Sequence, residues 1–119
     1  MSNQSVGKLG EDLVCCHLKK NGYKILERNY RFRWGEIDII AAKKGQTVFV
    51  EVKTRNSDRF GTPAEAVGLR KQKSIILAAQ QYIVQNGKAD ENYTFDVAEV
   101  RIQNGIPTIH YIENAFSLS

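Results

Sequence analysis

The sequence predicts a single α/β domain, spanning residues 1–119, in which helices flank a central mixed β-sheet. Two segments have apolar residues at helical spacing, and five others have the alternation or apolar runs of strands. Their order along the chain is α-β-β-β-α-β-β. A chain of 119 residues and 13.5 kDa has room for only one hydrophobic core.

The first predicted helix covers residues 6–20. Its apolar stripe is Val6, Leu9, Leu13 and Cys16, widened by Val14 and Leu18, and Gly22 ends it. Glu11 precedes Val14 by three positions and Leu18 by seven, so we expect its side chain beside the apolar stripe rather than opposite it.

Three strands are expected next, at residues 23–32, 36–42 and 47–54, with a tight turn at 43–46. A second helix is expected to open with Thr62 as N-cap, Pro63 in the first turn and Glu65 closing a capping box. Its main part covers residues 69–85. Two further strands follow, at residues 93–102 and 108–113.

The turn between the second and third strands predicts their register. If Lys44 and Gly45 form a two-residue loop, Lys43 faces Gln46, and the same count places Asp38 opposite Glu51 and Glu36 opposite Lys53. The acids then share one face of the sheet with Ile40 and Phe49. The other face is apolar, with Ile37, Ile39 and Ala41 against Val48, Val50 and Val52.

Asp38 and Glu51 therefore face each other in otherwise apolar strands, where two like charges destabilise the fold. A proton shared by the pair, the ammonium of Lys53 or a divalent cation could each compensate. Two hard oxygen ligands suit Mg²⁺. A buried ion cluster of Asp38, Glu51 and Lys53 without chemistry is the alternative.

Basic residues concentrate in the first part of the chain. Residues 1–75 hold 15 Lys/Arg and 8 Asp/Glu, a net charge of +7, which favours a polyanionic partner such as nucleic acid. Lys71 heads the stripe of Ile75, Ala78 and Tyr82, so it could point at the sheet and a phosphate or lie along the helix end. Candidate nucleic-acid contacts are Arg28, Arg31, Arg33, Arg55 and Arg59, interleaved with Tyr30, Phe32 and Trp34.

Other features bear on location. No apolar run approaches the roughly 20 residues of a membrane span, and the N-terminus lacks a secretory signal pattern. Cys15 and Cys16 are adjacent, which suits neither a disulfide nor a zinc framework, and we expect both to be buried. The sequence predicts a cytoplasmic protein without a membrane partner.

Asp38 followed by Glu51-Val52-Lys53 resembles the signature of PD-(D/E)XK nucleases, which have the restriction-endonuclease-like fold, although Ile37 occupies the position of their Pro. The strings GEIDII at 35–40 and VFVEVKTR at 48–55, with KLGE at 8–11 and GTPAEAV at 61–67 before Lys71, resemble a family of small bacterial predicted endonucleases similar to archaeal Holliday-junction resolvases. The resemblance covers residues 6–100.

The resemblance implies a role for each matching residue. Asp38, Glu51 and the Val52 carbonyl would bind Mg²⁺ or Mn²⁺, Lys53 would orient water or steady the phosphate, and Glu11 would be a further ligand, direct or through water. The expected activity is hydrolysis of DNA, including branched DNA. The alternatives are a nucleic-acid-binding module of the same fold without turnover and a structural protein. Cutting two strands would require a homodimer.

Overall fold

The computed structural model describes residues 3–55, 67–88 and 90–117, which form two helices and one five-stranded sheet. In chain order the elements are α1 (Asn3–Lys20), β1 (Lys24–Phe32), β2 (Gly35–Lys43), β3 (Gln46–Arg55), α2 (Leu69–Asn86), β4 (Asn92–Gln103) and β5 (Ile106–Phe116). The predicted α/β class and the predicted order of elements are confirmed. The proposed helix cap at Thr62, Pro63 and Glu65 lies outside the described residues.

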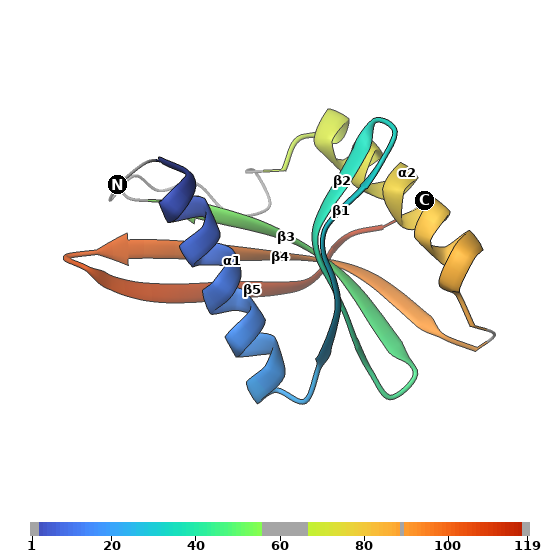
Figure 1. Cartoon of the computed structure of the whole chain (residues 1–119), viewed down its shortest axis with the longest axis horizontal. Coiled ribbons are helices and arrows are strands. Elements are labelled where there is room, and N and C mark those ends of the chain that lie inside the picture. Colours follow the sequence, from blue (N-terminus) through green and yellow to red (C-terminus); the bar gives the residue numbers. More distant parts are fainter. Residues whose placement is uncertain (1–2, 56–66, 89, 118–119) are drawn as a thin grey trace.

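The sheet is mixed, with the strand order β1-β2-β3-β4-β5. β3 and β4 are parallel and every other pair is antiparallel. The chain passes from β3 to β4 through a long crossover that contains α2, because two parallel neighbouring strands cannot be joined by a tight turn. β1 and β2 form an arm that crosses the other three strands steeply, with α1 on one side of the arm and α2 on the other (Figure 1).

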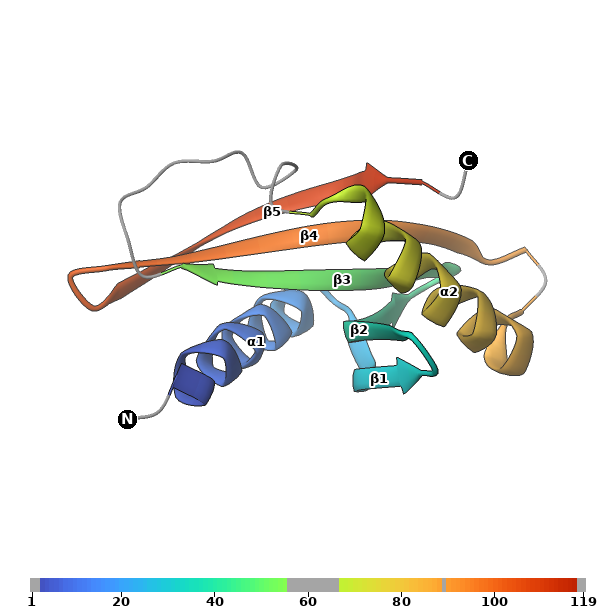
Figure 2. The same ribbon diagram turned by 90° about the horizontal axis from the view of Figure 1, so that it is seen from above.

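Each helix covers its own apolar core. Val14, Cys15 and Leu18 of α1 pack in a cluster with Val48 and Val50 of β3. A second cluster joins α2 to the sheet and contains Ile75, Ala78, Ala79, Tyr82, Phe49 and Phe95. Both faces of β3 are therefore buried, which explains its nearly continuous apolar sequence. The two helices and the edge of the sheet can be followed in Figure 2.

Two details of the predicted packing are wrong. Ile37 belongs to the α2 cluster with Ile40, whereas Ile39 belongs to the α1 cluster, so the expected alternation fails around Asp38. In α1, Cys15 is buried but Cys16 is exposed, because successive residues of a helix point about 100° apart. Among the described residues, neither helix has the length and apolar character needed to cross a lipid bilayer.

Two glycines permit the close helix contacts that shape the site. A Cβ added at Gly35, where β2 begins, would lie 2.2 Å from the backbone oxygen of Ser74 in α2. A Cβ at Gly10 of α1 would lie 1.9 Å from the side-chain oxygen of Thr54 in β3. Because a glycine has no side chain, α2 can approach β2 and α1 can approach β3 at these points.

We expect Gly35→Ala to lower the free energy of unfolding by about 1–3 kcal/mol, because the obstructing atom is backbone and cannot rotate away. Gly7→Ala is the matched control, since a Cβ there meets nothing within 4 Å and alanine favours the helix. Urea unfolding of both variants measures the difference. Equal stability of the two variants would contradict the close approach of α2.

Candidate active site

β2 and β3 separate at the acidic pair. Their pairing follows the predicted register from Lys43 and Gln46 to Ile39 and Val50 and ends there. β2 stays paired with β1, where Glu36 lies opposite Arg31, so the expected pairing of Glu36 with Lys53 is not formed. The two strands form a fork, and Asp38 and Glu51 are the first residues beyond the last pair.

A carboxylate takes the place of a strand partner in this fork. The backbone N–H of Val52 donates to Oδ2 of Asp38 at 2.8 Å, although the register would have placed the backbone of Ile37 there. In an antiparallel ladder the N–H and C=O of one residue point to the same neighbouring strand. The Val52 carbonyl therefore also points toward the β2 side, which is the side on which Asp38 lies.

Glu51 is buried, with 5% of its surface exposed. Its Oε2 lies 3.5 Å from Nζ of Lys71 and has no hydrogen-bond partner within the described part of the chain. Its carboxyl group lies close enough to that of Asp38 to raise the pKa of Asp38, and both acids line one cavity, although they lie beyond the last pair of the ladder. A buried carboxylate oxygen left without a hydrogen bond is costly, and it is an available ligand.

Burial raises the pKa of Asp38 to about 8, and its hydrogen bond to Glu51 and the charge of Glu51 add to the effect. The N–H of Val52 and the charge of Lys71 act in the opposite direction. Without a cation the pair therefore holds a proton near neutral pH. A divalent ion that binds both groups has to displace that proton, which couples binding to pH.

This proton predicts how stability depends on pH in the metal-free protein. The pKa of Asp38 is about 8 when folded but about 4 in an unfolded chain, so the folded state binds one more proton between these values. The contribution to stability is complete below pH about 4 and is lost as pH rises through about 8. In EDTA, wild type should lose more stability than Asp38→Asn between pH 5 and about 8.5, measured by urea unfolding. Parallel pH profiles would contradict the raised pKa.

The acids open into a cavity of about 450 Å³. Glu11 lines it from α1, and Val52 and Thr54 line it from β3. Arg28 Nη2 and Asn29 Nδ2 of β1 lie 3.4 and 3.3 Å from Oε1 of Glu11 and hold it in place. No group of three metal-binding side chains occurs among the described residues, and Glu11 lies in the wall of the same cavity as the two acids.

The residues of the fork fit a hard divalent cation. They offer a buried Glu51 oxygen that has no hydrogen bond to a described residue, a second carboxylate beside it and the carbonyl of Val52 on the same side. The cavity has space for water and a phosphate oxygen. The predicted ligand set of Asp38, Glu51 and Val52 is thus compatible with Mg²⁺ or Mn²⁺.

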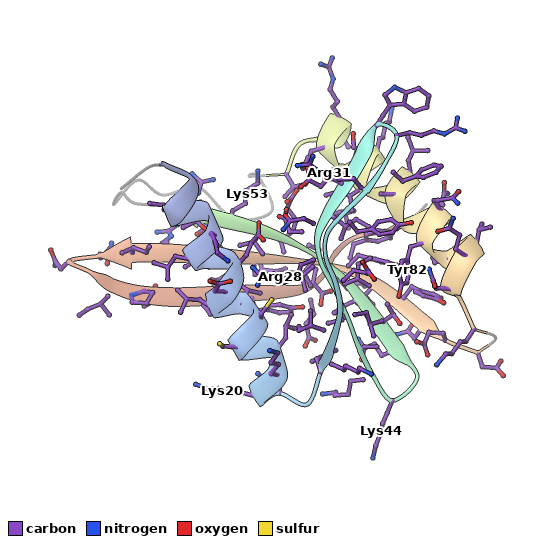
Figure 3. All side chains as sticks on the ribbon, in the orientation of Figure 1. Lys20, Arg28, Arg31, Lys44, Lys53 and Tyr82 are labelled. Atoms are coloured by element: carbon purple, nitrogen blue, oxygen red, sulfur yellow. The ribbon has the colours of Figure 1, made fainter. Side chains whose placement is uncertain are left out.

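The two predicted lysines differ in position. Lys71 points at the sheet and forms the ion pair with Glu51, which decides between the two orientations expected for it. Lys53 does not line the cavity, and it has no ion pair with any described residue. It lies on β3 two residues beyond Glu51 (Figure 3), and its ladder partner in β4 is Glu99. The alternative ion cluster of Asp38, Glu51 and Lys53 is not formed among the described residues, where the cation beside Glu51 is Lys71.

Three of the predicted arginines, Arg28, Arg31 and Arg55, form ion pairs with acids among the described residues. Arg28 joins α1 to β1 through Glu11 and Asp12, with its Nη2 at 2.8 Å from Oδ1 of Asp12. Arg31, on the β1–β2 arm, lies 3.5 Å from Glu36 and keeps 76% of its side chain exposed (Figure 3). Arg55 lies 3.3 Å from a carboxylate in β4. Arg59 lies outside the described residues.

Sequence reasoning missed Glu99, the carboxylate that binds Arg55. It is 1% exposed, and Nε of Arg101 lies 2.7 Å from its other oxygen. A lone acid within the apolar run VAEV was the available signal. Asp96, considered as a further acid near the site, instead accepts hydrogen bonds from the Tyr111 hydroxyl and the Asn114 N–H, which hold β5.

The chain matches the model of the uncharacterised protein family UPF0102 over residues 10–100. It is similar to UPF0102 proteins of Alkaliphilus oremlandii (50% identical over 116 residues, 96% of this chain and 99% of that protein) and Geobacter metallireducens (43% over 119 residues, 100% and 98%). A UPF0102 protein of Trichlorobacter lovleyi is 48% identical over 119 residues, covering 98% of this chain and 94% of its own.

Proposed function

We infer that this chain, which belongs to the uncharacterised protein family UPF0102, is a metal-dependent phosphodiesterase that cleaves DNA. The observation that carries the proposal is the fork between β2 and β3. There the Asp38 carboxylate replaces a strand partner, while a buried oxygen of Glu51 receives no hydrogen bond from any residue that the structure describes. The mixed five-stranded sheet with its two helices, the resemblance of the two sequence strings and the basic first part of the chain support the same proposal.

Asp38, Glu51 and the Val52 carbonyl would hold the ion. A bound Mg²⁺ or Mn²⁺ lowers the pKa of a water molecule and polarises the phosphate. The Val52 N–H donates to Oδ2 of Asp38, which orients the carboxylate. The other oxygen of Asp38 would then bind the ion. Arg28 and Asn29 fix Glu11 at the edge of the cavity, where its remaining oxygen can accept a hydrogen bond from water.

Two lysines supply positive charge for the phosphate. Lys71 lies beside Glu51, and 43% of its side chain is exposed, so its ammonium can reach a phosphate that enters the cavity. Lys53 extends from β3 at the next position on the same face as Glu51. Its proposed role is to steady the charge that develops on the phosphate, once DNA places a phosphate near β3.

The test is incubation of labelled branched and linear DNA with the purified protein in Mn²⁺, Mg²⁺ or EDTA. Cleavage that needs a divalent ion, and is lost in both Glu51→Ala and Lys53→Ala, is the expected result. Cleavage that persists in both variants would come from a contaminating nuclease. Stable metal binding by calorimetry without cleavage of any substrate would contradict the enzymatic proposal.

A second candidate is a nucleic-acid-binding module of the same fold without turnover. The ion pair of Lys71 with Glu51 favours it, because an ammonium already compensates part of the acidic charge. This candidate predicts DNA binding that is unaffected by Mn²⁺ and by Asp38→Asn. A gel-shift titration with and without the ion separates it from the enzyme.

A further inference from the structure

The turn between β1 and β2 presents an aromatic ring to solvent. Trp34 keeps 78% of its surface exposed, although large apolar side chains are usually at least half covered. The guanidinium of the neighbouring Arg33 lies 6.0 Å from the Trp34 ring and 5.4 Å from that of Phe32. The backbone of Arg33 is left-handed, with φ of 50°.

A second cavity, of about 330 Å³, lies against this turn. Its lining includes Arg31, Arg33, Trp34 and Lys71, and Glu36, the one acid among the described lining residues, is already paired with Arg31. The cavity thus combines three cations with one aromatic face. That combination suits an anionic backbone whose bases are free to stack.

Lys71 connects this cavity with the acidic fork. It lines the cavity at the turn, and its Nζ lies 3.5 Å from Oε2 of Glu51, which lines the cavity of the fork. A chain of phosphates that contacts Lys71 is therefore adjacent to both cavities. Because Lys71 and Trp34 line the same cavity, nucleotides that continue from Lys71 in this direction would lie along the β1–β2 arm.

We propose that the β1–β2 turn is a stacking platform for an unpaired base of single-stranded DNA, next to the phosphate held at the acidic fork. The inference rests on the proposed function and adds its substrate class. In a continuous duplex the faces of the bases are covered by their neighbours, so a protruding indole has nothing to stack on. DNA with an unpaired segment beside the cut, as at a flap or an open junction, has a base whose face is free to stack on Trp34.

Trp34 is the one tryptophan in the sequence, so intrinsic fluorescence reports directly on the platform. The probe is a short oligothymidylate, compared with a blunt duplex hairpin of equal charge, titrated in EDTA into wild type and Asp38→Asn. We expect the single strand to quench Trp34 emission in both proteins and the duplex to quench little. Binding of the single strand without quenching would overturn the inference.

Variants provide a second readout. By fluorescence anisotropy of labelled oligothymidylate, Trp34→Ala should bind roughly 5- to 150-fold more weakly, because stacking on a base is lost. Trp34→Phe should retain most of the affinity. Val84→Ala, another exposed apolar residue at the far end of α2, is the matched control and should bind as wild type does. Unchanged affinity in Trp34→Ala would overturn the proposal.

Failure of this inference differs from failure of the proposed function. Quenching without any divalent-dependent cleavage would remove the enzymatic proposal and leave the stacking platform intact. Cleavage by a protein that binds duplex and single strand alike, without quenching, would remove the platform and leave the enzyme.

Discussion

Glu51→Gln is expected to lower divalent-dependent DNA cleavage by roughly 10³-fold, which corresponds to about 4 kcal/mol of lost transition-state stabilisation. The amide keeps the shape of the carboxylate but cannot serve as an anionic ligand. The measurement is single-turnover cleavage at saturating protein, together with calorimetric titration of Mn²⁺. Both cleavage and the binding heat should disappear together.

The same substitution should leave the protein folded. In the metal-free state it removes one of two facing carboxylates, and with it the charge that helps raise the pKa of Asp38. Lys71 loses its counter-charge, but 43% of its side chain is exposed and remains hydrated. Urea unfolding in EDTA should therefore show no loss of stability beyond about 1 kcal/mol. Wild-type cleavage by this folded variant would contradict the proposed metal site.

The second large effect concerns stability and involves Glu99. Its carboxylate is 1% exposed and lies between Arg55, at 3.3 Å, and Arg101, at 2.7 Å. Glu99→Ala leaves both guanidinium groups without this partner at partly buried positions, and we expect a loss of about 3 kcal/mol of unfolding free energy. Thermal and urea unfolding of the metal-free protein are the measurements.

Glu27→Ala is the matched control for Glu99, because it removes an exposed glutamate from β1 and should change stability by no more than about 0.5 kcal/mol. Glu99→Gln separates charge from hydrogen bonding, since the amide can still accept from one arginine. The loss of unfolding free energy in Glu99→Gln should fall between the losses in Glu27→Ala and Glu99→Ala. Equal stability of Glu99→Ala and Glu27→Ala would contradict this prediction, because it would mean that water hydrates the two arginines adequately without the Glu99 carboxylate.

The hairpin explains why much of the site could be predicted from the sequence. The turn at Lys44 and Gly45 defines the register, and the apolar runs on both sides prevent a slip, so the meeting of Asp38 and Glu51 follows from counting. Helix spacing likewise placed Glu11 beside the core, but it left two orientations open for Lys71. Such predictions depend on local periodicity alone.

The separation of β2 from β3 could not be predicted in this way. It depends on which neighbour β2 keeps beyond Ile39, and the pairing with β1 and the contact of Gly35 with α2 decide that. Counting along the hairpin extended the pairs too far and so placed Lys53 opposite Glu36. Glu99 was missed for a similar reason, since its partners come from another strand and from two residues along its own.

The hydrogen bond between the Val52 amide and Asp38 has a spectroscopic consequence. The nitrogen-bound proton of Val52 experiences directly whether that carboxyl group is neutral, ionised or coordinated. Its resonance in a ¹⁵N-correlated NMR spectrum should therefore shift when the pH is lowered, when Mg²⁺ is added and when Asp38 is replaced by Asn. One backbone signal thus records the chemical state of the acid pair before any DNA is added.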